Sequence, residues 1–372
     1  MEFIDLAAQQ RRITAELNAN IARVLAHGQY INGPEVRELE QALAGYCGVK
    51  HAIGCASGTD ALLMALMALD IGPGDVVFTP PFTFIATAEP ISLLGATPAF
   101  VDIDPATFNI DPAKLEDAIR TWEGKGKAPR PRAVIPVDLF GLAADYDAIA
   151  AVAERHGLTV IEDAAQSFGG VYKGEKTCAF GMIACTSFFP AKPLGCYGDG
   201  GMCFTNDDRI DQILRSIRVH GHGSDKYENV RIGINGRLDT LQAAILLAKF
   251  TIFPEEIDLR QKAAKRYDEL LAGAVTTPVI PEGCLSAWAQ YSVLARDEAE
   301  RAAMTARLKA DGIPTAIYYP KPLHRQRAFA SLGYKESAFP VSDDCARRIF
   351  SLPMHPYLSA EEQRRIAAVL KK

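Results

Sequence analysis

The chain has 372 residues, which is long enough for two domains and a large hydrophobic core. Hydrophobic residues make up 48% and charged residues 23% of it, ordinary values for a globular protein. The net charge of −5 gives the molecule no overall attraction to nucleic acids or anionic membranes. No apolar run approaches the ~20 residues of a membrane-spanning helix, so we expect neither membrane nor nucleic-acid partners.

The N-terminal part of the chain predicts a helix over residues 8–27. Ile13, Leu17, Ile21 and Val24 fall on one face of it, the spacing that buries one side of a helix. The residues before this helix lack a basic start followed by an apolar stretch, so we expect no secretory signal.

Residues 55–69 read as a glycine-containing loop that enters a strongly apolar helix. Ser57 and Gly58 precede its first turn, and Thr59 adds a hydroxyl group. Free backbone N–H groups and the positive end of the helix dipole make such a start a good phosphate site. Ser57 and Asp60 also have the spacing of a helix cap. The two interpretations are compatible, because a phosphate and a capping oxygen use the same donors.

The middle of the chain predicts a strand–helix–strand unit. A short apolar run at 133–137 is followed by a helical pattern at 145–156, which Gly157 ends, and by a strand at 160–163. The Gly- and Pro-rich basic stretch at 123–132 is expected to be an exposed loop before the first strand. The two strands of such a unit should be parallel.

Asp163 would lie at the carboxyl end of the second of these parallel strands. Open α/β sheets bind their ligands at this edge, so Asp163 is a candidate ligand-binding residue. The alternative is that Asp163 and Gln166 form a capping pair at the following turn.

Lys192 lies in an unusual stretch, residues 187–201. Pro190 and Pro193 restrict the backbone on either side of it, and four glycines follow. Schiff-base chemistry needs such a restrained amine, because the nitrogen must attack a carbonyl from a defined direction. The alternative is an ordinary surface lysine in a loop.

The C-terminal third predicts a smaller α+β region. Its expected elements are a helix at 238–253 that Pro254 interrupts or kinks, its continuation at 255–271, a strand at 288–295, a helix at 298–310, a strand at 315–319 and a last helix at 359–370. We therefore expect a large domain at 1–250 and a small domain at 251–372.

Three of these features point to one ligand. Lys192 could form a Schiff base with an aldehyde, Asp163 could pair with a basic ring nitrogen, and residues 57–59 could bind a phosphate. Pyridoxal 5'-phosphate has all three groups. Asp163 would keep the ring nitrogen protonated through a charge-assisted hydrogen bond, which makes the ring an electron sink.

The chain resembles the DegT/StrS-type nucleotide-sugar aminotransferases, which have the fold-type-I pyridoxal phosphate architecture. This resemblance implies an α/β fold with a mostly parallel central sheet flanked by helices and a smaller α+β C-terminal domain, on which the N-terminal helix packs. It runs almost end to end, and the blocks that carry it are Phe3–Leu6, Gly28–Pro34, Ser57–Thr59, Phe82–Thr87, Phe100–Pro105, Glu162–Gln166, Ser187–Gly201 and Asn235–Ala244.

The resemblance also implies a role for each cofactor-binding residue. Lys192 would bond to the cofactor aldehyde and move the proton, Asp163 would pair with the ring nitrogen, and Gln166 would lie near the phenolic oxygen. Phe82 would stack on the ring. The phosphate would be held by Gly58, Thr59 and Ser187, and by Asn235 of the partner subunit, which implies a homodimer with shared active sites.

On the sugar side, the resemblance implies Arg237, Tyr318 and Tyr319. The guanidinium of Arg237 is suited to binding substrate carboxylates, which glutamate and a uronic acid both carry. The alternative is a structural ion pair between Arg237 and Asp239. His324 belongs to a basic cluster with its neighbours Lys321 and Arg325 that could serve a UDP group, and the alternative there is a solvated loop.

The subtype follows from the same resemblance. Residues 195–201 are similar to members that aminate the third carbon of the sugar. Residues 186–197 and 351–357 look most like enzymes that aminate a UDP-linked 3-keto N-acetylglucosaminuronic acid. The donor would be L-glutamate, the kinetics ping-pong, and the pathway the synthesis of a bacterial surface polysaccharide such as O-antigen.

The chain departs from the commonest family pattern in three places. Asp138 and Tyr318 stand where many members carry His, and Gly236 stands where Ser is frequent. The Tyr318 departure leaves sugar recognition open, because a phenol and an imidazole donate differently. The alternatives are a transaminase of a dTDP- or UDP-linked 3- or 4-keto-6-deoxyhexose, a dehydratase on the same scaffold, and a non-catalytic regulatory relative that binds the cofactor. Lys192 argues against the last two.

The cysteines and histidines suggest no metal site. None of the eight cysteines forms a Cys-x-x-Cys pair, which is typical of buried free thiols in a reducing compartment and predicts a cytoplasmic protein. His220 and His222 flank one glycine but lack nearby carboxylate or thiol partners, so we expect no metal.

Overall fold

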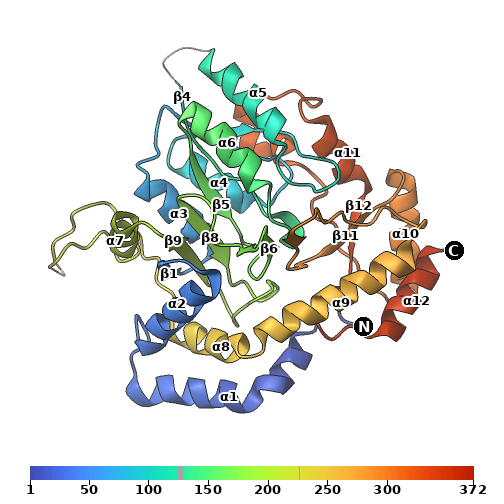
Figure 1. Ribbon diagram of the computed structural model, residues 1–372, viewed down its shortest axis with the longest axis horizontal. Coiled ribbons are helices and arrows are strands. Elements are labelled where there is room, and N and C mark those ends of the chain that lie inside the picture. The colour runs from blue at the N-terminus through green and yellow to red at the C-terminus, as the bar shows by residue number, and fades with distance from the viewer. Residues whose placement is uncertain (125–128, 226) are drawn as a thin grey trace.

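A seven-stranded sheet forms the centre of the larger part of the molecule in the computed structural model, which describes residues 1–124, 129–225 and 227–372 (Figure 1). The strand order is β1-β9-β8-β5-β4-β2-β3. The neighbours from β3 to β8 are parallel, whereas β9 is antiparallel to both β8 and β1. The expected mostly parallel α/β sheet is therefore confirmed. Its strands are β1 (His51–Cys55), β2 (Asp75–Thr79), β3 (Thr97–Phe100), β4 (Arg130–Val134), β5 (Thr159–Asp163), β8 (Ile183–Ser187) and β9 (Gly201–Thr205).

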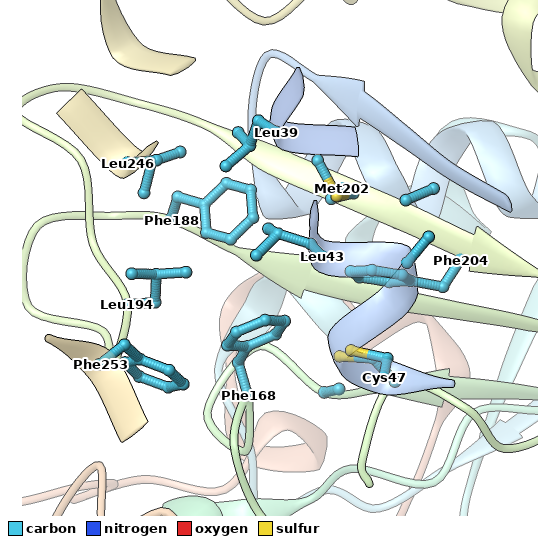
Figure 2. Close-up of a cluster of buried hydrophobic side chains, with 14 of the residues drawn as sticks. Leu39, Leu43, Cys47, Phe168, Phe188, Leu194, Met202, Phe204, Leu246 and Phe253 are labelled. Atoms are coloured by element: carbon cyan, nitrogen blue, oxygen red, sulfur yellow. The ribbon is translucent and has the colours of Figure 1, made fainter. Parts of the chain in front are cut away.

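Helices cover both faces of this sheet. They are α2 (Pro34–Cys47), α3 (Gly58–Ala68), α4 (Glu89–Leu93), α5 (Pro112–Glu123), α6 (Tyr146–His156), α7 (Asp208–Ile217) and α8 (Thr240–Phe250). Alternate residues of a strand point to opposite faces. On β9, Met202 and Phe204 accordingly join the core under α2 and α8 (Figure 2), whereas Cys203 joins the core under α3 and α7.

The strand–helix–strand unit forms as predicted, with one shift. Asp145 caps the start of α6 and Gly157 ends it in a left-handed conformation. The strands β4 and β5 are parallel, but β4 begins at Arg130 rather than at 133, so the expected exposed loop is shorter. Part of that loop, residues 125–128, lies outside the described residues. Arg130 pairs with the buried Asp75 at 2.7 Å, which explains why a basic, proline-containing segment enters the sheet.

The C-terminal part contains two helices where one interrupted helix was predicted. Helix α8 ends at Phe250, and α9 (Phe253–Leu271) has Pro254 in its first turn. The break therefore falls before the proline, because a proline fits the first turn of a helix, where its missing N–H is not needed. The remaining elements are α10 (Glu298–Ala310), α11 (Pro340–Arg348), α12 (Ala360–Leu370), the pair β11 (Tyr291–Leu294) and β12 (Ile349–Leu352), and the small sheet of β6 (Val171–Tyr172), β7 (Glu175–Lys176) and β10 (Cys284–Leu285).

The strand predicted at 315–319 is wrong. Ala316 makes a single bridge to Ser351, and no strand forms around it. Pro314 and Pro320 bracket the segment, and a proline cannot donate a hydrogen bond to a strand ladder.

The N-terminal helix α1 (Leu6–His27) lies along α8 (Figure 1). Ile13 and Leu17 share a small apolar cluster with two residues of α8. The first turns of α1 also reach α9, where the Gln9 side chain donates to Glu256 at 2.8 Å. The N-terminal helix thus contacts residues on both sides of position 250.

Three general expectations can be compared with this fold. All eight cysteines are free, and seven of them are buried; Cys284 is partly exposed. Across the described ranges, no helix is both long and apolar enough to cross a membrane. The same ranges contain no group of three or more His, Cys, Asp or Glu side chains that could hold a metal ion.

Candidate active site

Asp163 ends β5 at the carboxyl edge of the sheet, as predicted, and is almost fully buried. Its Oδ2 accepts a hydrogen bond from the Thr87 hydroxyl at 2.8 Å, and its Oδ1 accepts one from the Ala165 N–H at 3.2 Å. Burial raises the pKa of Asp163, while these two hydrogen bonds and the nearby Lys192 act in the opposite direction. Gln166 makes its bonds elsewhere and no helix follows, so the alternative capping pair does not form.

Lys192 is held in the turn that follows β8. Its N–H donates to the Phe189 carbonyl at 2.9 Å. The backbone at Gly195 passes close to Pro190: a Cβ added to Gly195 would lie 2.6 Å from the Pro190 carbonyl oxygen. The side chain is partly buried, and its amine has no hydrogen-bond partner among the residues that the structure describes. Burial lowers the pKa of Lys192 to about 8, whereas the Asp163 carboxylate raises it. An amine with a lowered pKa is more often neutral near pH 7 than that of an ordinary surface lysine, and only the neutral amine is nucleophilic.

The expected phosphate site is brought together by close packing at the start of α3. Ser57 caps the helix by accepting from the Asp60 N–H at 3.0 Å, and Gly58 and Thr59 occupy the first turn, where N–H groups have no partner within the helix. Gly58 passes directly by Ser187, since an added Cβ would come within 2.6 Å of the Ser187 Cβ. The cap is therefore formed, and the packing leaves the phosphate interpretation open.

Gln166 connects the edge of the sheet to the C-terminal part. Its Oε1 accepts from the Phe140 N–H at 2.7 Å, and its Nε2 donates to the Tyr319 hydroxyl at 3.2 Å. Burial raises the pKa of Tyr319, and the negative charge of Asp163 raises it further. Gln166, Tyr319 and Asp163 thus lie in one region, as predicted.

Phe82 does not have the position expected of a stacking residue. Its side chain has no exposed surface and packs against Phe108, with ring centroids 6.4 Å apart. Phe84, by contrast, is 56% exposed, although both rings have their centroids 6.3 Å from that of Tyr319. In a regular extended segment, residues 82 and 84 would point to the same side, because successive side chains alternate in direction. Here the segment bends into the 3-10 turn Ile85–Thr87, and the two side chains have different surroundings. Phe84 is therefore the aromatic residue that remains open to a ligand.

The segment around Asn235 and Arg237 runs beside the loop that starts α3. Arg237 bridges to Cys55, and the Gly236 carbonyl accepts from the Ala56 N–H at 3.1 Å. Arg237 is partly buried, its Nε lacks a partner, and within the described ranges it forms no ion pair, so the alternative pairing with Asp239 is not formed. Asn235 is exposed.

His324 is not brought to an open site. Its side chain is fully buried, with its ring 4.8 Å from the Phe339 ring and 3.6 Å from the Asp343 carboxylate. Burial lowers the pKa of His324. Arg325 is already paired with Asp343 at 2.7 Å, so the predicted basic cluster is reduced to the exposed Lys321.

Tyr318 lies in the same apolar neighbourhood as Phe82 but is partly exposed. Its ring centroid is 5.8 Å from that of Tyr319 and 6.5 Å from that of Phe3. Burial raises the pKa of Tyr318. It remains close enough to Tyr319 to border the same site.

The residues assembled here fit pyridoxal 5'-phosphate on the chemistry of their donors. A free amine, a buried carboxylate within its electrostatic reach, and a helix start packed against a serine match the aldehyde, ring nitrogen and phosphate of that cofactor.

Comparisons with known proteins agree with this assignment. The model of the DegT/DnrJ/EryC1/StrS aminotransferase family matches residues 11–371. The chain is 53% identical over 371 residues to a UDP-2-acetamido-2-deoxy-3-oxo-D-glucuronate aminotransferase from Pseudomonas aeruginosa, covering 100% of this chain and 99% of that protein. A crystal structure of a DegT DnrJ EryC1 StrS aminotransferase from Brucella abortus is 53% identical, with a TM-score of 0.96 over 100% of this chain and 98% of that chain. That of S. venezuelae DesV with a ketimine intermediate is 37% identical, with a TM-score of 0.94 over 100% and 97%. The chain is a pyridoxal-phosphate-dependent transaminase and belongs to the DegT/DnrJ/EryC1/StrS aminotransferase family.

Proposed function

We propose that this transaminase moves the amino group of L-glutamate to the third carbon of UDP-2-acetamido-2-deoxy-3-oxo-D-glucuronic acid. The observation that carries the reaction is the partly buried Lys192 amine beside the buried Asp163 carboxylate. The substrate is supported by the relative that is 53% identical over the whole chain, whose name specifies that sugar.

The roles of the residues follow from their positions. When bound, the cofactor supplies an electron-accepting ring that stabilises negative charge on the neighbouring carbon. Asp163 would pair with the ring nitrogen, and Gly58, Thr59 and Ser187 would hold the phosphate. Lys192, with a pKa of about 8, can take a proton from the substrate carbon and return it near neutral pH. We assign ring stacking to Phe84, because Phe82 is buried.

Arg237 is our candidate for binding the substrate carboxylates. It is partly buried, and its Nε has no partner among the described residues, so a bound carboxylate would supply one. A planar guanidinium binds a carboxylate through two parallel hydrogen bonds. The two substrates carry this group in common and would use Arg237 in turn.

We further propose a homodimer with shared active sites, in which Asn235 reaches the phosphate of the partner subunit. The segment that leads to Asn235 carries two large exposed apolar side chains, Val230 at 51% and Ile232 at 85% exposure. Exposed apolar groups in one segment are typical of an interaction surface.

We place the enzyme in the cytoplasm, in the synthesis of a surface polysaccharide. We also propose a large domain at 1–250 and a small domain at 251–372.

The substrate is tested by incubating the enzyme with glutamate and a set of 3-keto and 4-keto nucleotide sugars, with mass detection of the aminated product. We expect turnover of the UDP-linked 3-keto uronic acid. Turnover of a 4-keto sugar alone would contradict the regiochemistry, and binding of the cofactor without any turnover would favour a regulatory relative. Borohydride reduction of the holoenzyme followed by peptide mapping should label Lys192.

A further inference from the structure

Two buried carboxyl groups form a pair directly beside the site. Asp138 follows β4, Glu162 precedes Asp163 in β5, and neither side chain has any exposed surface. The Asp138 N–H donates to the carbonyl of Asp163, the residue after Glu162, and the two carboxyl groups lie close enough for each to influence the pKa of the other. Two adjacent buried carboxyl groups cannot both carry a charge at low cost, so such a pair retains a proton unless a cation compensates.

Asp138 is the better placed of the two to carry negative charge. It accepts hydrogen bonds from the Ser167 hydroxyl at 2.7 Å, the Tyr146 hydroxyl at 2.8 Å and the Ala144 N–H at 2.9 Å. Burial still raises the pKa of Asp138 to about 6, against the effect of these donors. Three donors to one carboxyl group make it the acceptor in the pair.

Glu162 has fewer donors than Asp138 and, among the residues that the structure describes, forms no ion pair. Its oxygens accept there from the backbone N–H groups of Cys178 and Phe180, at 2.7 and 2.8 Å. Burial, followed by the charge of Asp138, raises the pKa of Glu162 well above its usual range. Among the described residues, the groups whose pKa values respond to the charges of the pair include Tyr146, Cys178, Cys185 and Cys284, which are all acids and supply no positive charge.

The pair connects the two turns that carry the cofactor-binding side chains. The Asp138 N–H donates to the Asp163 carbonyl at 3.0 Å, and the Asp163 N–H donates to the Pro136 carbonyl at 3.0 Å. Two residues on from Asp138, the Phe140 N–H holds the Gln166 side chain at 2.7 Å. A displacement of the Asp138 turn would therefore move Asp163 and Gln166 together.

We propose that Asp138 and Glu162 are positioning residues that hold one proton between them, with Glu162 as the donor and Asp138 as the acceptor. This shared proton fixes the turns that carry Asp163 and Gln166. The proposal rests on the transaminase site but not on the identity of its sugar. It gives a role to Asp138, one of the three positions that the sequence comparison with the family pattern singled out.

The proton itself is tested by infrared spectroscopy of the holoenzyme at pH 7. We expect the C=O stretching band of a protonated, buried carboxyl group in the wild type and its loss in Asp138→Asn. In that variant the amide can donate to Glu162, which no longer needs the proton, so the fold should be retained. The matched control is Asp102→Asn. Asp102 is also a buried acceptor, but its donors are the Ile103, Val341 and Ser342 N–H groups and the Ser342 hydroxyl and not a carboxyl group, so its band pattern should match the wild type.

The positioning role is tested by the pH dependence of stability and by cofactor binding. Because the pair binds its proton more tightly in the folded protein, the wild-type unfolding midpoint should fall as pH rises from 6 to 8, and less steeply in Asp138→Asn. Asp138→Leu, which removes the acceptor, should weaken cofactor binding by at least about tenfold. A wild type without the band, an Asp138→Asn protein that keeps it, or an Asp138→Leu protein with unchanged cofactor affinity would overturn the proposal. None of these outcomes depends on the sugar screen.

Discussion

The hydroxyl group of Thr87 donates to the Asp163 carboxylate at 2.8 Å and is itself within 3.0 Å of the Thr83 hydroxyl. This bond opposes burial, which raises the pKa of Asp163. A charged Asp163 is what a protonated ring nitrogen needs. We expect Thr87→Val to weaken cofactor binding by about 10- to 100-fold, the usual effect of losing a hydrogen bond to a charged group.

The measurement is the cofactor dissociation constant as a function of pH. Because Thr87→Val removes a donor to the charged form, the pKa of Asp163 should rise further, and the defect should grow as pH falls. Thr83→Val is the control, since Thr83 does not contact Asp163 and should have a smaller effect. An equal loss at every pH would mean that the hydroxyl group acts by packing alone.

Phe82 and Phe84 should respond to truncation in opposite ways. Phe82→Ala should cost about 3–5 kcal/mol of stability, because the ring is fully buried. Phe84→Ala should leave stability within about 0.5 kcal/mol. It should instead weaken cofactor binding by about 0.5–1.5 kcal/mol, the contribution of an aromatic stacking contact. Thermal unfolding and cofactor titration of both variants distinguish the roles, and a stable Phe82→Ala protein that fails to bind would reverse our assignment.

The contrast between these two residues shows what the sequence could predict. The strand–helix–strand unit at 130–163, the edge position of Asp163 and the restrained Lys192 follow from local patterns of apolar residues, glycine and proline. The direction of a side chain in an irregular loop does not, because it depends on the turn at Ile85–Thr87 and on the packing of Phe108. The Phe82–Thr87 block identified this loop, but the sequence did not show which of its two rings is exposed.

Long-range pairings were equally beyond local patterns. His324 and Arg325 look like a solvated basic loop in the sequence, yet both lie against Asp343, whose position is set by α11. The pairing of Asp138 with Glu162 also needs the parallel register of β4 and β5, which places two distant acids side by side. Only a folded chain shows such neighbours.

The pKa of Lys192 makes a prediction about cofactor loading. Burial lowers the pKa to about 8, and only the neutral amine attacks an aldehyde. Below that pH the neutral fraction falls about tenfold per pH unit. The rate at which the cofactor-free protein takes up pyridoxal phosphate should therefore rise with pH up to about 8 and then level off. A rate that continues to rise to pH 10 would indicate an ordinary lysine, and Lys192→Ala should form no covalent bond at any pH.

Lys249 is a buried cation whose replacement should stabilise the protein. Its side chain has no exposed surface, and its Nζ has no hydrogen-bond partner in the described parts of the chain; it lies 4.1 Å from the centre of the Tyr197 ring. Burial lowers the pKa of Lys249 from 10.5 to about 8, which corresponds to a cost of about 3 kcal/mol for the charged amine. The cation–π contact with the Tyr197 ring offsets about 1–2 kcal/mol of this cost. We expect Lys249→Met to gain about 1–2 kcal/mol at pH 7, since its volume is similar.

The sign of the pH effect provides the check. The folded protein binds fewer protons than the unfolded chain between pH 8 and 10.5, so the cost of Lys249 is complete below pH 8 and disappears above 10.5. The advantage of Lys249→Met in chemical denaturation should shrink between these limits. Lys262→Met, at an exposed position on the adjacent helix α9, should show no such trend. A destabilised Lys249→Met protein at pH 7 would show that the cation–π contact outweighs burial.

The shared active site can be tested by mixing two inactive subunits. If Asn235 serves the site of the partner subunit, a Lys192→Ala chain supplies an intact Asn235 to the intact Lys192 of an Asn235→Ala chain. Random reassociation of equal amounts should then restore about a quarter of the wild-type activity, because half of the dimers are mixed and each has one complete site. Each parent variant alone must first be shown to be impaired. If Asn235 acts within its own chain, no combination contains a complete site, and mixing will restore nothing.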